Sequence, residues 1–399
     1  MTGAGRGEGA GVSSPPSMAN LRREIGRWDT GRPGPTLMVL AGIHGNEPAG
    51  VVALQRVLGR LQELEVPVRG RVVGLAGNLS ALADGRRFLD RDLNRGWSAA
   101  AIEAMRRRLP QDLSPEDREQ QALLQAFEGV LHTASGPLVY LDLHSSSADG
   151  APFLCLADTI DNRRLGLATG IPIILGIEET IDGASLEWFA QRGILAIAAE
   201  GGQHTRAETI ANHEALLWLV AVHLGIVPAD RVDLAPHRER LRAAASSVPA
   251  IVEIVRRHAI TADDAFVMEP GFTNFSAVRR GQRLARDRRG EILAPSDCRV
   301  LLPLYQKLGD DGFFLARTVR PFWLHVAKWM RAARVDRIVH WMPGVRRDPD
   351  DRDTILVNPR VARWLVTEVF HLLGFRKERR RGDRLAFTRR WSLPENARL

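Results

Sequence analysis

AGIHGNEPAG, residues 41–50, is the stretch that decides the fold. It follows an apolar run, residues 37–41, that predicts a buried strand, and it precedes an amphipathic pattern, residues 51–64, that predicts a helix. His44 and Glu47 therefore lie in a tight, glycine-containing turn at the carboxyl end of a strand, where open α/β sheets bind their ligands. Two side chains able to bind a metal ion share one short loop.

Apolar runs alternate with helical patterns over the first 230 residues of the chain. The further predicted strands cover residues 70–77, 138–143, 153–156, 171–175 and 194–199, and the further helices cover residues 114–132, 185–192 and 205–224. Strands that are apolar throughout and alternate with helices are typical of a sheet with helices on both faces. We expect an α/β fold with a mostly parallel or mixed sheet.

Composition divides the chain into four predicted segments. They are a Gly/Ser/Pro-rich disordered leader (1–17, ahead of Met18), an α/β catalytic domain (18–232), a smaller β-rich capping domain (245–321), and a helical, basic, Trp-containing extension (322–399) whose helical patterns lie at 322–333 and 359–373. Residues 321–399 hold 18 Lys/Arg against 9 Asp/Glu, a net charge of +9, whereas the whole chain has a net charge of +8. The basic extension could bind nucleic acid, but it carries no nucleic-acid module, so the pattern favours a solvated face.

Hydropathy and cysteine content bear on membrane association and on the redox compartment of the protein. We find no apolar run of about 18 residues, so the sequence predicts no transmembrane helix and no membrane partner. Cys155 and Cys298 are the only cysteines and form no C-x-x-C pair, which predicts two small buried hydrophobic residues in a reducing cytoplasm. The sequence leaves open whether the protein forms a homo-oligomer.

Four isolated polar residues follow predicted strands: His44, Glu47, His144 and Glu200. A parallel sheet would bring all four to one edge. Two histidines and one glutamate form a three-ligand zinc site with an open fourth position, which is typical of catalytic zinc. A carboxylate that does not bind the metal is then needed to take a proton from water, and Glu200 is placed for that role.

An arginine-dense loop, residues 86–97, follows the second predicted strand of the catalytic domain. Clustered arginine and asparagine side chains beside a sheet edge commonly bind a carboxylate. The loop is therefore a candidate for substrate binding.

These motifs resemble the succinylglutamate desuccinylase/aspartoacylase family, which has a zinc-carboxypeptidase-like fold. The first zinc motif reads His44-Gly45-Asn46-Glu47, the second reads Asp142-Leu143-His144, and the arginine motif spans residues 87–95. The resemblance covers residues 37–200 and extends more loosely to about residue 319. It implies one Zn²⁺ per chain, held by His44, Glu47 and His144.

The resemblance also implies roles for other residues. Glu200 would be the general base, Arg87 would stabilise the oxyanion, and Asn94 and Arg95 would bind the substrate's α-carboxylate. Asp92 would orient an arginine or a zinc ligand. Asn78 corresponds to an asparagine of the family near the site, and Tyr305 is a candidate for the tyrosine that the second domain lends to the pocket, with core packing as the alternative.

One departure from the family concerns the substrate. Members that act on N-acetylaspartate have a tyrosine and an arginine shortly before the last catalytic strand, whereas Arg192 is the only cation in residues 185–192. The same region contains Glu178, Glu179 and Glu187. We therefore expect a substrate whose side chain is neutral or cationic.

The sequence thus predicts a zinc-dependent amidohydrolase that removes an acyl group from an N-acyl amino acid or similar small carboxylate. One alternative is a zinc carboxypeptidase that acts on short peptides. Another is a non-catalytic binding module that uses the basic extension.

Overall fold

The strand that leads into the metal-binding turn, β2 (Thr36–Ala41), lies inside a large mixed sheet. The computed structural model describes residues 18–29, 31–64, 69–319, 322, 330, 341, 343–349, 354–358, 375–381 and 384–389. Within these residues the sheet has eleven strands, in the order β1 (Glu24–Asp29), β3 (Arg71–Ala76), β2, β4 (Leu138–Ser146), β7 (Leu195–Gln203), β5 (Phe153–Leu156), β6 (Ile173–Leu175), β8 (Ile251–Ala259), β14 (Asp311–Thr318), β13 (Cys298–Leu301) and β10 (Ser276–Val278). Strands β3, β2, β4 and β7 are parallel, which confirms the predicted α/β class.

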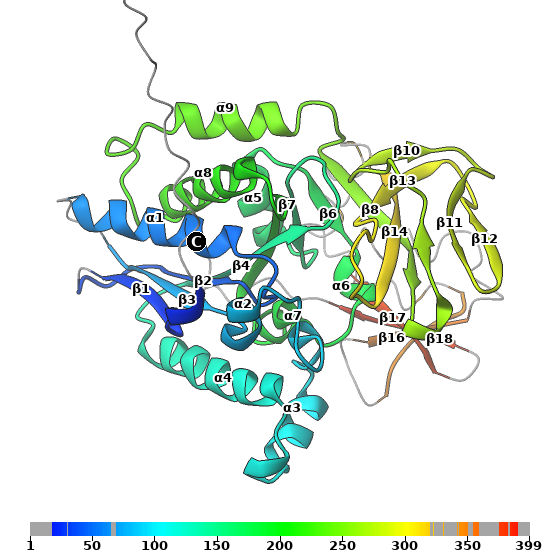
Figure 1. Cartoon of the computed structure of the whole chain (residues 1–399), viewed down its shortest axis with the longest axis horizontal. Coiled ribbons are helices and arrows are strands. Elements are labelled where there is room, and N and C mark those ends of the chain that lie inside the picture. The colour runs from blue at the N-terminus through cyan, green and yellow to red at the C-terminus, as the bar shows by residue number, and fades with distance from the viewer. Residues whose placement is uncertain are drawn as a thin grey trace, which may run out of the picture.

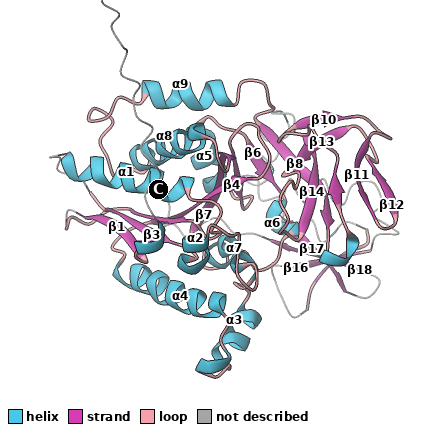
Figure 2. Cartoon of the chain, in the orientation of Figure 1, coloured by secondary structure: helices cyan, strands magenta, loops and turns pink. Residues whose placement is uncertain are grey.

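Helices cover both faces of this sheet (Figures 1 and 2). One face carries α1 (Ala49–Glu63), α5 (Ile160–Thr169), α8 (Ala207–His223) and α9 (Ala235–Ala244), and the other carries α3 (Ala99–Arg106), α4 (Pro115–Thr133) and α7 (Ser185–Ala190). The short helix α2 (Leu79–Asp84) packs Leu82 into the same core cluster as α1. Strand β2 contributes to the core on both faces of the sheet, because Val39 packs on the α1 side and Met38 on the α4 side. Such a strand is buried on both faces, which is why its sequence is apolar without alternation.

Helix α4 begins as the sequence predicts. The Ser114 hydroxyl accepts a hydrogen bond from the Asp117 backbone N–H, and the Asp117 carboxylate accepts one from the Ser114 backbone N–H. This reciprocal cap satisfies two donors that an α-helix otherwise leaves without partners.

The β-rich region is joined to the catalytic sheet. Strand β6 pairs in parallel with β8, and β8 pairs with β14, so the sheet continues across the predicted boundary near residue 232. A separate three-stranded sheet, β12 (Gly290–Leu293), β11 (Arg283–Asp287) and β9 (Val267–Met268), packs at the outer end of this region. Short polar strands interrupted by turns explain why the sequence pattern indicated a distinct unit.

The extension contains a four-stranded antiparallel sheet that the sequence analysis did not anticipate. Its order is β15 (Val345–Arg347), β16 (Thr354–Val357), β18 (Arg384–Arg389) and β17 (Phe375–Arg381). The helical patterns at 322–333 and 359–373 lie outside the described residues, apart from Phe322 and Met330, and so does the leader at 1–17. No helix in the described parts of the chain is both long and apolar enough to cross a membrane.

Candidate metal centre and active site

His44, Glu47 and His144 come together at the carboxyl ends of β2 and β4. The Nδ1 atom of His44 lies 2.9 Å from Oε1 of Glu47, and Nδ1 of His144 lies 3.1 Å from Oε2 of the same carboxylate. One ligand atom from each residue lies within 4.8 Å of the others, and all three side chains are buried. The strand ends assemble the predicted ligand set, although His144 stands inside β4 rather than after it.

A second carboxylate supports each histidine on its other ring nitrogen. Nε2 of His44 lies 3.1 Å from Asp92, and Nε2 of His144 lies 3.2 Å from Asp142. Metal-binding histidines commonly donate their second N–H to a carboxylate, which fixes the tautomer and the ring orientation. Because both Nδ1 atoms then face Glu47 as acceptors, the donor set of two imidazoles and one carboxylate fits Zn²⁺.

The charges around the ligands hold the carboxylates ionised. Burial acts to raise the pKa of Glu47, but the neighbouring His44 and His144 outweigh it and hold that pKa well below its ordinary value. Burial is likewise outweighed at Asp92, where His44 and Arg87 hold the carboxyl pKa well below its usual range. The site thus offers negative charge to a cation.

Glu200 lies beside this centre on β7. It is the register neighbour of His144 across the parallel β4–β7 pair, and it lines the same cavity. Its Oε2 atom is buried and has no hydrogen-bond partner. Burial raises the pKa of Glu200 to about 7. A carboxyl group with such a pKa can both accept and return a proton near neutral pH.

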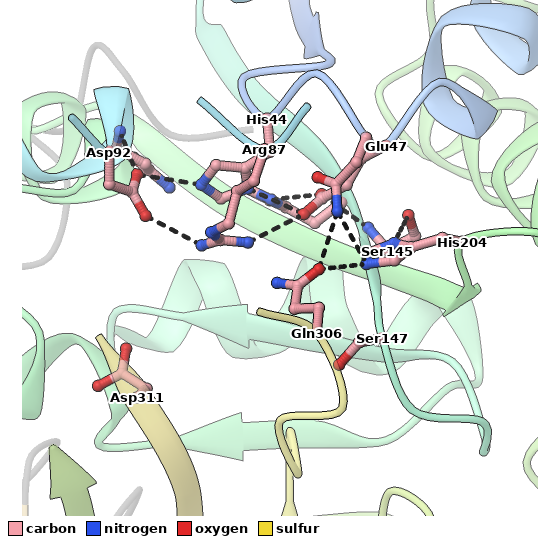
Figure 3. Close-up of polar contacts among 12 residues, drawn as sticks. His44, Glu47, Arg87, Asp92, Ser145, Ser147, His204, Gln306 and Asp311 are labelled. Atoms are coloured by element: carbon pink, nitrogen blue, oxygen red, sulfur yellow. Dashed lines mark hydrogen bonds and ion pairs between the residues drawn. The ribbon is translucent and has the colours of Figure 1, made fainter. Parts of the chain in front are cut away.

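Arg87 reaches the centre from the arginine-rich loop (Figure 3). Its guanidinium donates to Asp92 over 3.0 Å and to Glu47 over 3.4 Å. The loop also approaches the metal-binding turn closely, because a Cβ atom on Gly45 would lie only 2.4 Å from the Arg86 carbonyl oxygen. Only glycine at position 45 permits this approach.

Glu116, at the start of α4, holds the same loop in place. Its buried carboxylate accepts hydrogen bonds from the backbone N–H groups of Leu89, Asp90 and Arg91, over 2.8, 3.1 and 3.4 Å, and from the Asn78 amide over 3.1 Å. A buried carboxylate is stable only with such partners. Glu116 is therefore the anchor of the arginine loop.

Asn94 and Arg95, predicted to bind a carboxylate, both line the cavity but already have protein partners. The Asn94 amide oxygen accepts from the Ser185 backbone N–H over 2.8 Å, and Arg95 donates to Asp311 over 2.8 Å. Gly183 brings the α7 segment against this loop, since its φ is +75° and a Cβ there would meet the Arg95 carbonyl oxygen. Both residues thus line the cavity, and their partners Ser185 and Asp311 are distant in sequence.

Polar side chains from three segments meet on the opposite side of the cavity. Gln306 accepts a hydrogen bond from the Asn46 amide over 2.8 Å, and its oxygen lies 3.3 Å from Nε2 of His204. Nδ1 of His204 lies 2.8 Å from the Ser145 hydroxyl. Figure 3 shows this group on one side of Arg87 and Asp311 on the other.

Asn78 and Tyr305 lie outside the cavity lining. Asn78 is fully buried, caps α2 by accepting from the Ala81 N–H, and donates to Glu116. The Tyr305 hydroxyl donates to the Glu269 carbonyl and accepts from the Phe272 N–H, so this exposed side chain ties its loop to the β-rich region. The neighbouring Gln306 is one of the side chains that the β-rich region contributes to the cavity, and Asp311 is another.

The charged residues of the segment before β7 differ in whether they line the cavity. Glu178 and Glu187 line the cavity, whereas Arg192 lies over the Trp188 ring, 3.6 Å from its centroid, and donates to the Trp188 carbonyl. The side chain of Glu179 is outside the described set. Cys155 is buried in the cavity wall as predicted, but Cys298 is only half-buried.

Sequence reasoning missed several cavity residues for identifiable reasons. His204 directly follows β7, so the rule that located Glu200 could have located it. Gln306 and Asp311 carried no signal, because they approach Asn46 and Arg95 from positions more than 200 residues away. Long-range pairing of this kind leaves no local pattern in a single sequence.

Comparison with known proteins agrees with these features. Residues 33–213 match the profile of the succinylglutamate desuccinylase/aspartoacylase catalytic domain. A succinylglutamate desuccinylase from Pseudomonas fluorescens (strain SBW25) is 30% identical over 113 residues, which is 28% of this chain and 31% of that protein. The matched stretch thus spans about a third of that relative's length.

Solved structures support the fold. A succinylglutamate desuccinylase/aspartoacylase from Rhodobacter sphaeroides aligns with a TM-score of 0.53 at 18% identity, covering 73% of this chain and 87% of that one. Murine aminoacylase 3 aligns with a TM-score of 0.51 at 20% identity, covering 72% of this chain and 96% of that one. These alignments extend beyond the catalytic segment into the rest of the chain.

Proposed function

Because residues 33–213 belong to the succinylglutamate desuccinylase/aspartoacylase family, we propose that this protein is a zinc-dependent deacylase. Its substrate would be a small N-acyl amino acid or related carboxylate, and the scissile bond would be a linear amide. The observation that carries the proposal is the unpartnered, buried carboxylate oxygen of Glu200 beside the cluster of His44, Glu47 and His144.

His44, Glu47 and His144 would hold one Zn²⁺ through two imidazole nitrogens and a carboxylate oxygen. Zinc bound by three such ligands lowers the pKa of water toward about 7 and polarises carbonyl groups. Asp92 and Asp142 would orient both imidazoles and accept the Nε2 proton of each, which leaves Nδ1 to bind the metal, since each carboxylate lies against the second ring nitrogen of its histidine.

Glu200 would act first as base and then as acid. Its carboxylate takes the proton of the attacking water and later gives a proton to the leaving nitrogen. The raised pKa of Glu200, about 7 as a result of burial, suits a group that performs both transfers near neutral pH. Arg87 would stabilise the negative charge that develops on the amide oxygen, because it reaches the same cavity with its guanidinium.

Asn94 and Arg95 would bind the leaving amino acid near its α-carboxylate. Arg95 donates one hydrogen bond to Asp311 and one to the Asn94 carbonyl. The other side of the cavity, with Gln306, His204 and Ser145, would then receive the acyl group through uncharged donors and acceptors.

The proposal is tested by metal content and substrate range together. Purified protein is expected to hold about one Zn²⁺ per chain. It is expected to hydrolyse N-acetyl amino acids faster than short peptides with a free carboxyl terminus. Faster peptide cleavage would indicate the carboxypeptidase alternative, and zinc-loaded protein that hydrolyses neither class would refute the proposal. Loss of a salt-dependent gel shift on removal of residues 322–399 would instead favour the binding-module alternative.

A further inference from the structure

Asp311 pairs with Arg95, the residue expected to bind the substrate's α-carboxylate. The Nη2 atom of Arg95 donates to Asp311 over 2.8 Å, and Nη1 donates to the Asn94 carbonyl over 3.0 Å. The remaining Nε atom is buried and has no partner, so it does not face the cavity. Asp311 itself lines the cavity and is largely buried.

A second arginine fixes Asp311 from the other side. Nε of Arg257, on β8, bonds to the second oxygen of the Asp311 carboxylate, and Nη1 of Arg257 donates to the Thr180 carbonyl over 2.8 Å. Asp311 thus bridges the arginine loop of the catalytic segment and β8 of the β-rich region. Held by both its oxygens, it presents a fixed negative charge beside Arg95.

The rest of the charge on the cavity wall is also compensated or acidic. Among the described residues that line the cavity, the guanidinium groups are those of Arg87 and Arg95, and both already pair with carboxylates. Glu178, on α6 (Ile177–Thr180), and Glu187, on α7, line the same wall. A carboxylate arriving there meets acidic groups and arginines whose charge is already shared.

We propose that Asp311 is a specificity-determining residue that makes the amino-acid end of the cavity disfavour an acidic substrate side chain. The preferred leaving group is therefore an amino acid with a neutral or cationic side chain. This inference rests on the proposed deacylase function and adds to it the residue that sets the charge preference. It also separates this chain from a desuccinylase that releases glutamate.

The physical reason is electrostatic. At a half-buried site, one unit of charge at contact range changes binding of a charged group by roughly tenfold to a hundredfold. Removal of the Asp311 charge would leave Arg95 and Arg257 without their shared counter-ion, and this wall would become positive. An acidic side chain would then bind more tightly than it does beside the Asp311 carboxylate.

The test uses two substrates that differ only in charge, N-acetyl-L-aspartate and N-acetyl-L-asparagine. The selectivity is the ratio of kcat/KM for the acid to kcat/KM for the amide. Wild-type protein is expected to prefer the amide, and Asp311→Asn is expected to raise the ratio by about tenfold or more. Thermal unfolding and zinc content confirm that the variant is folded and loaded.

Two control variants test whether the effect comes from the carboxylate that pairs with Arg95 or from any negative charge near the cavity. Asp310→Asn removes the same charge one residue earlier, from an exposed position on the cavity rim that pairs with no arginine in the described structure, so it is expected to change the ratio by less than about threefold. Asp311→Glu keeps the charge and is expected to retain the preference for the amide.

A binding measurement makes the inference independent of catalysis. Calorimetry compares L-aspartate with L-asparagine, the product-side counterparts of the two substrates, on wild type and on Asp311→Asn. If zinc-loaded wild type hydrolyses no N-acyl compound, the proposed function fails, and this affinity ratio still tests Asp311. An unchanged ratio in a folded Asp311→Asn variant, or an equal shift in Asp310→Asn, would overturn the inference.

Discussion

The two halves of the cavity are built in different ways. In the metal-proximal half, His44, Glu47, His144 and Glu200 all come from adjacent strand ends of one parallel sheet. In the far half, Gln306 comes from the loop between β13 and β14, and Asp311 is the first residue of β14. They reach residues of the catalytic segment that are 260 and 216 positions away in sequence. The first half is fixed by the topology of the sheet, and the second depends on a few long-range polar contacts. We expect the reaction to reside in the first half and the choice of substrate in the second.

The largest expected effect tests the metal-proximal half. Glu200→Gln keeps the shape of the side chain but removes its ability to accept a proton, so kcat is expected to fall by about 10²–10⁴-fold. Zinc content is expected to stay at the wild-type level, because Glu200 is not among the clustered ligands. Steady-state kinetics and metal analysis measure the two quantities. Glu208→Gln, an exposed change on α8, is the matched control, and normal turnover in Glu200→Gln would disprove the proposed role.

The next effect concerns the carboxylates behind the histidines. Asp142 lies 3.2 Å from Nε2 of His144 and also accepts from the Ser185 hydroxyl over 2.9 Å. Asp142→Asn is expected to weaken zinc binding by about 10–100-fold, because the amide no longer fixes the imidazole as an acceptor toward the metal. Competition with a chromogenic chelator measures the affinity. Equal zinc affinity in the variant and the wild type would show that zinc binding does not depend on the carboxylate of Asp142 behind His144.

A smaller effect is expected where the two halves meet, at the arginine loop. Glu116→Gln would turn amide protons toward backbone N–H donors, and it is expected to lower the free energy of unfolding by about 2 kcal/mol. Urea or thermal unfolding measures this loss. Glu128→Gln, on the exposed side of the same helix, is expected to change stability by less than about 0.5 kcal/mol. Equal stabilities of the two variants would contradict the anchoring role.

The smallest effect isolates the far half. Gln306→Ala removes a side chain proposed to bind the acyl group. It is expected to raise KM by about threefold to tenfold while kcat changes little, since one hydrogen bond to the substrate is worth about 1 kcal/mol. Lys307→Ala, at the exposed neighbouring position, serves as the control. A fall in kcat without a change in KM would place Gln306 in the reaction rather than in substrate binding.

The sequence predicts the metal-proximal half well and the far half poorly. His44, Glu47, His144 and Glu200 each stand at the end of an apolar run, so a local pattern and the geometry of parallel strands suffice to bring them together. Asp311 and Gln306 carry no such signal, and the prediction placed Tyr305 instead of its neighbour. A single register step along an irregular segment decides which of two adjacent side chains faces the cavity.

The predicted boundary between the catalytic and β-rich segments lies within a continuous sheet. The short strands after residue 245, separated by glycine and proline, resemble an independent β-unit. The three-residue pairing of β6 with β8 joins them to the main sheet, and periodicity predicts a strand at 171–175 without showing which strand pairs with it. The sheet formed by β15 to β18 was missed for a similar reason, because charged strands such as β17 lack the apolar alternation that marks a strand.

Because the sheet continues from β6 into β8, the wall that carries Arg257 and Asp311 is hydrogen-bonded to the catalytic core rather than hinged on it. A substrate therefore cannot enter by a swing of the β-rich region as a rigid body. The segment of residues 302–310 also lines the cavity and is held by side-chain contacts such as those of Gln306 with Asn46 and of Ser147 with the backbone of Tyr305. A motion that limits product release would then be that of a loop of nine residues and not of a domain.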